Sequence, residues 1–146
     1  MIVVLITEKD GKRYQMALKY SRQREIIRNF MKTRTDHPTA DVVYMNVRKE
    51  IPNISLGTVY RNLMLLTQMG ELTKVEIGDG TVHFDPLTDD HAHLICEQCG
   101  AVEDLMLTPD EVLVAEAEEL SGGRITGHII TFRGLCRDCL AAEEAE

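Results

Sequence analysis

Residues 55–69 read SLGTVYRNLMLLTQM, and this stretch decides how the first half of the chain is interpreted. Apolar residues recur at helical spacing from Val59 to Met69. Ser55 is a suitable N-cap, and Gly70 is a suitable residue for ending the helix. The stretch therefore predicts an amphipathic helix that begins after Ser55 and ends near Met69.

Two further helices are predicted upstream of this one. The first spans Ser21–Lys32, where apolar residues again recur at helical spacing behind a polar N-cap candidate. The second runs from Thr39 or Ala40 to Glu50 and stops before Pro52. The apolar residues of the second helix that we expect to face inward are Val42, Val43 and Val47.

Two short strand-like runs, 72–77 and 81–84, follow the third helix and are joined by Gly78-Asp79-Gly80, a strong hairpin signal. Three helices and a hairpin in this order describe a winged helix-turn-helix, whose third helix would lie in the major groove of DNA. A three-helix pattern alone would equally describe any small helical bundle. The basic charge of the segment favours DNA binding over that alternative.

The exposed side of the third helix supplies the candidate DNA-contacting residues, which are Ser55, Thr58, Tyr60, Arg61 and Asn62. Arg61 could form a bidentate contact with a guanine. Tyr60 could contact a thymine methyl group or a phosphate.

The net charge of −8 argues against nucleic-acid binding when the chain is taken as a whole. Residues 1–85, however, carry 13 Lys and Arg against 10 Asp and Glu, whereas residues 86–146 carry 3 against 14. Between Gly11 and Arg61 there are 11 basic and 4 acidic residues. Such asymmetry indicates two modules with different partners, the first of them basic.

No apolar run approaches the roughly 18–20 residues of a membrane span, and no signal peptide is visible. We therefore expect a cytoplasmic protein with no membrane partner, in which thiols stay reduced. All four cysteines lie in the acidic half as two CxxC pairs: Cys96 with Cys99, and Cys136 with Cys139. Two such pairs favour a tetrahedral structural Zn²⁺ site over a redox pair or four unrelated thiols.

The acidic half is predicted to contain strands over 92–96 and 101–105, a helix from Thr108 to about Leu120, a third strand over 124–132, and a short helical tail. So small a unit leaves a sheet edge and an apolar helix face exposed, and dimerisation would cover both. The expected fold class is α+β, with a winged-helix DNA-binding domain at 1–85, a hinge at 86–91 and a small α/β dimerisation domain at 92–146. Residues 1–18 are assigned as an N-terminal extension or helix, and the opening run 2–6 is compatible with a strand, a disordered start or an upstream extension.

The motifs together resemble the ferric uptake regulator (Fur) family. The residues that carry the resemblance are SLGTVYRNL at 55–63, HAHLICEQCG at 91–100 and the second cysteine pair. The resemblance implies a homodimeric, metal-dependent repressor that binds a palindromic double-stranded DNA operator, with structural Zn²⁺ on the cysteines. It also implies a regulatory Fe²⁺ or Mn²⁺ at the hinge, and the matching positions are His37, Asp85, His91, His93 and Asp104.

Aspartate rather than glutamate at positions 85 and 104 resembles the peroxide-responsive (PerR-like) branch. In that branch hydrogen peroxide reacts at bound Fe²⁺, a ligand histidine (His37 or His91) gains an oxygen, and the repressor leaves DNA. Iron-level sensing, or zinc, manganese or nickel sensing, remains the alternative within the family.

Two further features bear on the branch assignment. Glu111 and His128 match a weaker additional metal site of the iron-sensing branch, although Ala92 replaces an acidic ligand there. His83 shares a strand face with Asp85, and we interpret it as a wing residue near DNA phosphate rather than as a ligand.

Two functions outside metal-dependent repression are compatible with parts of the sequence. A hydrolytic enzyme could use the histidine pair to hold its metal, but that function gives no role to the basic segment or to the third helix. A zinc-stabilised interaction module without a regulatory metal would bind DNA regardless of His37 or Asp85. We expect a regulator that is not an enzyme.

Overall fold

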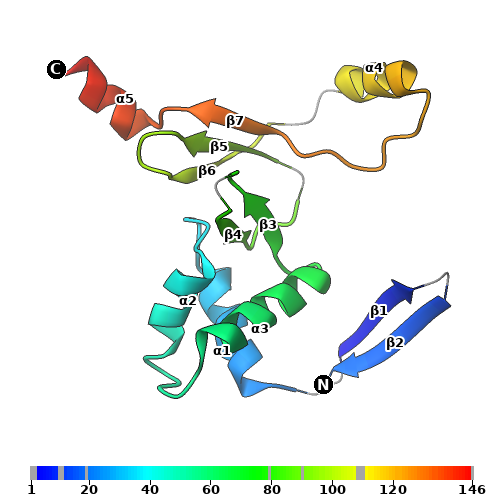
Figure 1. The fold of residues 1–146 in the computed structure, drawn as a ribbon, viewed down its shortest axis with the longest axis vertical. Coiled ribbons are helices and arrows are strands. Elements are labelled where there is room, and N and C mark those ends of the chain that lie inside the picture. The colour runs from blue at the N-terminus through cyan, green and yellow to red at the C-terminus, as the bar shows by residue number, and fades with distance from the viewer. Residues whose placement is uncertain are drawn as a thin grey trace. The chain divides into compact units, whose positions relative to one another are not determined.

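The computed structural model describes residues 3–9, 12–18, 20–78, 80–89, 91–107 and 111–145 (Figure 1). The chain divides into two compact units, Met1–Thr88 and Asp89–Glu146. Within the described residues, no helix has both the length and the apolar character that crossing a membrane requires.

The chain begins with an antiparallel pair of strands, β1 (Val3–Lys9) and β2 (Lys12–Leu18). Their register pairs Val3 with Leu18 and Lys9 with Lys12. The helix considered for residues 1–18 is therefore wrong. The run VVLIT at 3–7 contains four β-branched residues, a residue type that favours extended backbone.

Three helices form the body of the first unit: α1 (Arg22–Lys32), α2 (Ala40–Val47) and α3 (Leu56–Gln68). Each begins behind a side-chain hydroxyl that accepts a hydrogen bond from a backbone N–H of the first turn, supplied by Ser21, Thr39 and Ser55. The predicted helices are confirmed, except that α2 ends at Val47 and residues 48–50 form turns.

The core of the first unit lies where the three helices meet the hairpin that follows them. Its fully buried side chains include Ile27, Met31, Val43, Val59, Leu63, Leu66 and Phe84. The prediction that Val42 faces inward is wrong, because that side chain is 41% exposed. Val43 and Val47 are four residues apart and share the buried stripe, so Val42 is rotated onto the neighbouring face of the helix.

The hairpin of the first unit consists of β3 (Thr73–Glu76) and β4 (Val82–Asp85), which pair antiparallel with Val75 opposite His83. Gly78 and Gly80 both have positive φ, +89° and +86°, as tight hairpin connections require. Asp79, the middle residue of the predicted turn, lies outside the described residues. The predicted winged helix-turn-helix is confirmed in its element order and its strand pairing.

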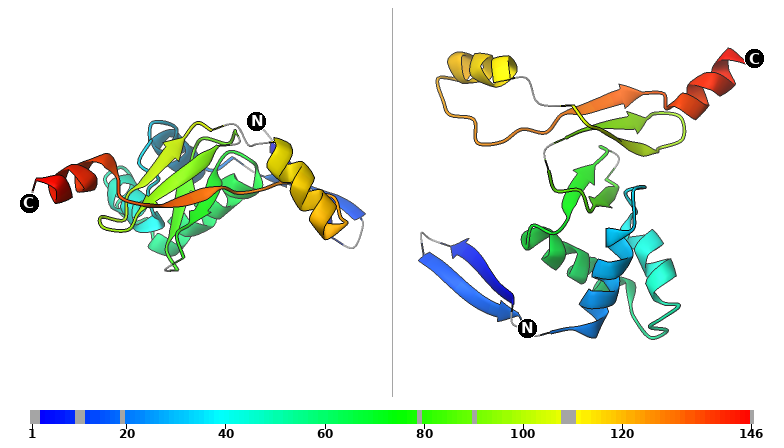
Figure 2. Two further views of the ribbon diagram at one scale, coloured as in Figure 1. Left: turned by 90° about the horizontal axis from the view of Figure 1, so that it is seen from above. Right: turned by 180° about the vertical axis from the view of Figure 1, so that it is seen from behind.

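The second unit contains a three-stranded sheet in the order β6-β5-β7 (Figure 2). β5 (Ala92–Cys96) pairs antiparallel with β6 (Val102–Leu105) and parallel with β7 (Thr131–Gly134). Two helices complete the unit, α4 (Glu111–Ser121) and α5 (Arg137–Glu144). The predicted helix start at Thr108 falls on residues 108–110, which lie outside the described part of the chain.

The predicted third strand of this unit, 124–132, is largely wrong. Only Thr131 and Phe132 of that range belong to β7, which continues to Gly134, and residues 124–130 form no strand. β5 is five residues long and its register with β7 begins at His93 and Thr131. Residues 124–130 precede the first position of this register.

Candidate metal centres and nucleic-acid interface

The four cysteines come together at one end of the second unit's sheet. Cys96 ends β5, Cys99 lies in the following turn, Cys136 caps α5 and Cys139 lies on its first turn. The parallel register of β5 with β7, which sets Cys96 beside Gly134, brings the second pair next to the first. The two cysteine pairs, which are far apart in the sequence, therefore lie next to each other in the fold.

The spacing of the sulfurs fits a tetrahedral tetrathiolate centre. All four Sγ atoms lie within 4.8 Å of one another, and the Sγ atoms of Cys99 and Cys136 are 3.8 Å apart. A metal held at about 2.3 Å by four thiolates has sulfur–sulfur edges of about 3.8 Å. The cysteines form no disulfide.

The electrostatics of the thiols also fit a cation site. Backbone N–H groups of Cys136 and Cys99 lower the pKa of the Cys96 thiol to about 6. Hydrogen bonding with the Cys136 thiol, together with burial, raises the pKa of Cys139 to about 12. The site stabilises one thiolate but resists further negative charge, and a bound cation would remove that resistance.

A second group of ligand atoms lies in the same unit, at the start of β5. The strand register places His93 directly opposite Asp104 on β6, so both side chains project from the same face of the sheet. Asp104 Oδ1 lies 3.0 Å from His91 Nε2 and 3.5 Å from His93 Nε2. The two imidazole Nε2 atoms are 3.0 Å apart. We refer to these three residues as the sheet half-site.

The orientation of His91 is set by its other ring nitrogen. His91 Nδ1 lies 2.6 Å from the carbonyl oxygen of Asp89, which can only accept a hydrogen bond. Nδ1 therefore carries the proton and donates it, which leaves the Nε2 lone pair directed toward the half-site. Such a partner behind a ligating imidazole is usual in metal sites.

The first unit holds the other two candidate ligands, His37 and Asp85, which we call the loop half-site. Both residues are 1% exposed, and His37 Nε2 lies 3.5 Å from Asp85 Oδ2. Asp85 Oδ1 accepts a hydrogen bond of 2.7 Å from the Leu87 N–H, so the other carboxylate oxygen is the one directed at His37. His37 belongs to the loop between α1 and α2, and Asp85 ends β4.

Both half-sites have the ligand spacing that a first-row metal requires. Donor atoms at about 2.1 Å from a metal are about 3.0 Å apart at octahedral angles and about 3.4 Å apart at tetrahedral angles. The distances of 3.0–3.5 Å within the sheet half-site and 3.5 Å within the loop half-site agree with this range. Imidazole and carboxylate donors without thiolate suit Fe²⁺ or Mn²⁺.

The structure gives His83 a contact within the first unit, and its interpretation as a residue near DNA phosphate stays a prediction. Its Nδ1 lies 2.6 Å from the carbonyl oxygen of His37, and the ring is half-buried. The two residues are separated by 46 positions in the sequence, so no local pattern signals the contact.

Glu111 and His128, the residues of the weaker additional site, are both exposed. Among the described residues, neither belongs to a group of three or more close potential metal ligands. That site stays a prediction.

The third helix presents part of the predicted DNA-reading set to solvent. Arg61 is exposed, Tyr60 is 44% exposed and Thr58 is half-buried, and Arg61 Nη2 donates a hydrogen bond of 3.2 Å to Thr58 Oγ1. Ser55 is the N-cap of α3, and its Oγ accepts a hydrogen bond of 3.1 Å from the Thr58 N–H.

The assignment of Asn62 to the DNA-facing side is wrong. Its side chain is only 8% exposed and donates a hydrogen bond of 2.9 Å from Nδ2 to the Thr58 carbonyl. Asn62 is three residues after Val59 and four before Leu66, so it lies on the stripe that those core residues occupy.

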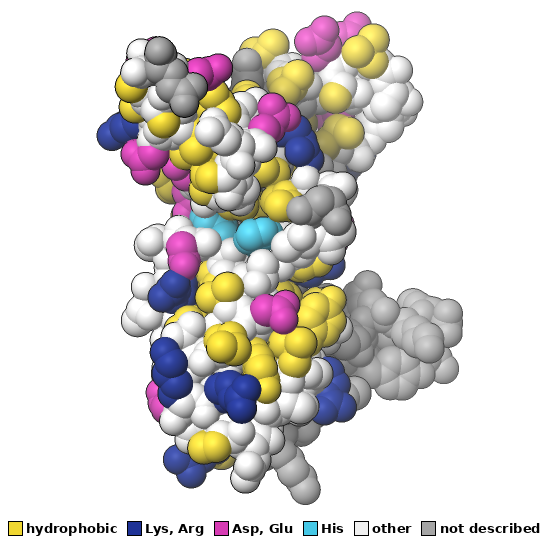
Figure 3. All heavy atoms as spheres, turned by 60° about the vertical axis from the view of Figure 1, so that its left-hand side comes forward, with side chains coloured by type: hydrophobic (Ala, Val, Ile, Leu, Met, Phe, Trp, Pro, Cys, Tyr) yellow, Lys and Arg dark blue, Asp and Glu magenta, His cyan; other side chains and the backbone are white. Residues whose placement is uncertain are grey.

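An open groove of the first unit adjoins the exposed part of α3. It is lined by the start of α2 (Thr39–Asp41), by Leu56, Gly57 and Tyr60 of α3, and by residues 80–82 of the wing. On the face drawn in Figure 3, Lys and Arg side chains lie mainly over the first unit and Asp and Glu side chains mainly over the second. The surface charge thus follows the division found in the sequence.

Comparison with known proteins agrees with this arrangement. The chain matches the ferric uptake regulator family over residues 15–133. The peroxide-responsive repressor PerR of Staphylococcus saprophyticus is 35% identical over 117 residues, which make up 80% of this chain and 79% of that protein.

Solved structures give the same result. The peroxide stress regulator of Campylobacter jejuni is 29% identical with a TM-score of 0.64, over 80% of this chain and 88% of that one. The ferric uptake regulator Fur of Helicobacter pylori has a TM-score of 0.70 at 21% identity, over 84% of this chain and 83% of that one, and supports the fold alone. The chain therefore belongs to the ferric uptake regulator family of metal-binding, DNA-binding regulators, and peroxide-responsive repressors are among its relatives.

Proposed function

We propose that this protein is a metal-dependent repressor that senses hydrogen peroxide through oxidation of a ligand histidine. The observation that carries the proposal is the pair of half-sites, which contain only imidazole and aspartate donors with metal-like spacing. The similarity to peroxide-responsive repressors supports the choice of signal. The role is that of a regulator rather than an enzyme.

One metal ion would take ligands from both half-sites. Only five residues separate Asp85 from His91, so their Cα atoms cannot be more than about 22 Å apart. Two ligands from the loop half-site and three from the sheet half-site would give the five-coordinate N/O sphere that Fe²⁺ or Mn²⁺ accepts. A metal bound this way would bind more tightly to one relative arrangement of the two units than to others. This difference in metal-binding free energy would couple metal binding to DNA affinity.

The protein's own residues hold and orient the site. Asp85 and Asp104 provide carboxylates for the cation, and the Asp89 carbonyl keeps the Nε2 atom of His91 available as a ligand. Fe²⁺ held by these residues would supply the electrons for reduction of hydrogen peroxide, and His37 and His91 would be the ligand imidazoles exposed to that oxidation. An oxidised ring is a poorer ligand, so the linked arrangement and the affinity for DNA are both lost. Mn²⁺ would fill the site without this chemistry.

DNA binding and dimerisation are assigned to different units. α3 of the first unit would read the major groove through Arg61 and Tyr60, and a twofold dimer would read a palindromic operator. The second unit would form the dimer, with Zn²⁺ on the four cysteines as its structural centre. Val112, Leu120 and Ile129 of this unit are 70%, 82% and 84% exposed, and a partner subunit would cover such side chains.

The test is to load the protein with Fe²⁺, add hydrogen peroxide and analyse the peptides containing His37 and His91 by mass spectrometry. The proposal predicts one added oxygen on at least one of the two residues, together with loss of DNA binding. Protein loaded with Mn²⁺ is the control and should show neither change. If neither histidine gains oxygen while DNA binding persists, peroxide sensing is excluded and sensing of iron level replaces it.

A further inference from the structure

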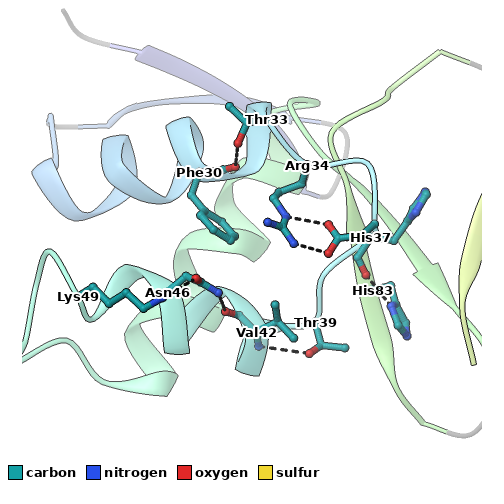
Figure 4. A network of polar contacts seen from close by, with 10 residues as sticks. Phe30, Thr33, Arg34, His37, Thr39, Val42, Asn46, Lys49 and His83 are labelled. Atoms are coloured by element: carbon teal, nitrogen blue, oxygen red, sulfur yellow. Dashed lines mark hydrogen bonds and ion pairs between the residues drawn. The ribbon is translucent and has the colours of Figure 1, made fainter.

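The loop that carries His37 is held against strand β4 by three contacts, and Figure 4 shows one of them, between His83 and the His37 carbonyl. His83 Nδ1 lies 2.6 Å from the carbonyl oxygen of His37. The backbone N–H of Phe84 donates a hydrogen bond of 3.0 Å to the carbonyl of Pro38. Thr39 and His83 form an isolated antiparallel bridge. The loop therefore behaves locally as a third strand beside the wing.

The backbone at His37 needs such fastening. With a φ of +47°, His37 is the one non-glycine residue with positive φ in the described part of the chain. A side chain with a Cβ is strained in this left-handed region, and surrounding contacts must hold it there. This backbone conformation sets the direction in which the side chain leaves the Cα atom, and so the direction of the buried imidazole. It also directs the His37 carbonyl toward His83.

Of the three contacts, only the one from His83 uses a side chain, so it is the one that a substitution can remove. The His37 carbonyl can only accept, so the His83 ring donates through Nδ1–H. The His83 ring is half-buried, whereas its neighbour Phe84 is fully buried and belongs to the core. Replacing His83 would therefore remove a hydrogen bond without leaving a cavity in the core.

We propose that His83 is a positioning residue for the regulatory metal: its Nδ1–H holds the His37 peptide so that His37 Nε2 faces Asp85. The inference rests on the proposed function, because His83 would act through His37, which is itself a proposed metal ligand. His83 would not bind the metal directly. Mutation of a hydrogen-bond partner of a ligating histidine commonly lowers metal affinity by about 10-fold to 100-fold.

The same contacts place His83 between the metal site and the DNA-binding elements. Thr39, which bridges to His83, is the N-cap of α2, and the start of α2 lines the groove beside α3. Fixing His37 thus also fixes the start of α2 against the wing. Metal bound at the loop half-site would stabilise these contacts, and His83 would transmit part of that stabilisation to the DNA-binding surface.

The experiment compares four forms of the full-length, zinc-loaded protein: the wild type, H83L, H83N and the control K74L. Asn places an amide donor close to the Nδ1 position, whereas Leu has none. Lys74 lies on the neighbouring strand β3 and is partly exposed, so K74L changes the wing surface without touching the loop. The measurements are the Mn²⁺ dissociation constant, the visible spectrum of the Co²⁺-loaded regulatory site, and amide exchange of Phe84 in protein without regulatory metal.

We expect H83L to weaken Mn²⁺ binding about tenfold, to shift the Co²⁺ spectrum and to accelerate Phe84 exchange. H83N should recover most of each change, and K74L should match the wild type. If H83L does not fold, H83A takes its place, because alanine also lacks a donor at the Nδ1 position.

Two results would overturn the inference: wild-type Mn²⁺ affinity in H83L, or equal losses in H83N and in the variant without a donor. Either result leaves the proposed function intact if the wild type still binds DNA in response to Mn²⁺. A wild-type protein whose DNA binding ignores Mn²⁺ would overturn the proposed function and this inference together.

Discussion

Removal of the cysteine-bound zinc should unfold the second unit and leave the first unit folded. The reason is the unequal distribution of the core. In the described residues of the second unit, the buried apolar side chains other than cysteine are Ala92, Ile95 and Val102. The first unit, in contrast, has a continuous cluster that includes Leu63, Leu66 and Phe84.

The magnitudes show which contribution dominates. Full burial of Ile95 and Val102 stabilises the unit by about 1.5–3 kcal/mol each. A structural Zn²⁺ contributes about 10–16 kcal/mol in small zinc-dependent domains, which is as large as the whole folding stability of a typical domain. The C96S variant loses a thiolate that is 1% exposed and so should lose most of that contribution.

The assay is hydrogen exchange followed by mass spectrometry, on C96S and on wild-type protein treated with a strong zinc chelator. Peptides from β5, β6 and β7 should lose protection and the dimer should dissociate, while peptides from α3 keep their protection. A101S is the matched control, because Ala101 is an exposed neighbour in the same knuckle and should behave as wild type. Native protection of β5 in zinc-free C96S would refute the reasoning.

Three further substitutions test the assignments in the first unit. R61A should weaken binding to the operator far more than binding to random DNA, by about 1–3 kcal/mol, in a titration at fixed salt; equal losses on both DNAs would contradict base reading. N62A should lower stability by about 1 kcal/mol in urea denaturation and leave the ratio of specific to random binding unchanged, because its amide bonds Thr58. F84A should cost about 3–5 kcal/mol in the same denaturation assay, since Phe84 is fully buried, and a loss below 1 kcal/mol would be incompatible with its place in the core.

The elements that the sequence predicted well are those determined by residues close together in the chain. The three helices of the first unit follow from hydroxyl caps at Ser21, Thr39 and Ser55 and from apolar residues at helical spacing. The wing follows from glycines that favour the backbone conformation its connection adopts. These determinants act within one or two turns of chain, so they can be recognised without the tertiary structure.

What the sequence could not provide depends on contacts between distant segments. Asn62 is polar and lies in the helix proposed to read DNA, yet the packing of α3 turns it inward with Val59 and Leu66. The contact of His83 with the His37 carbonyl joins positions 46 residues apart. The end of β7 is likewise set by its partner β5 rather than by its own composition.

We propose that one metal, held by residues of both units, controls DNA binding. Operator affinity with and without Mn²⁺ tests it most directly, in the wild type, in H37A from the first unit and in H93A from the second. We expect Mn²⁺ to tighten operator binding by the wild type and to leave the operator affinity of both variants unchanged. Both variants should retain zinc and remain dimers. Full Mn²⁺ response in either variant would contradict it.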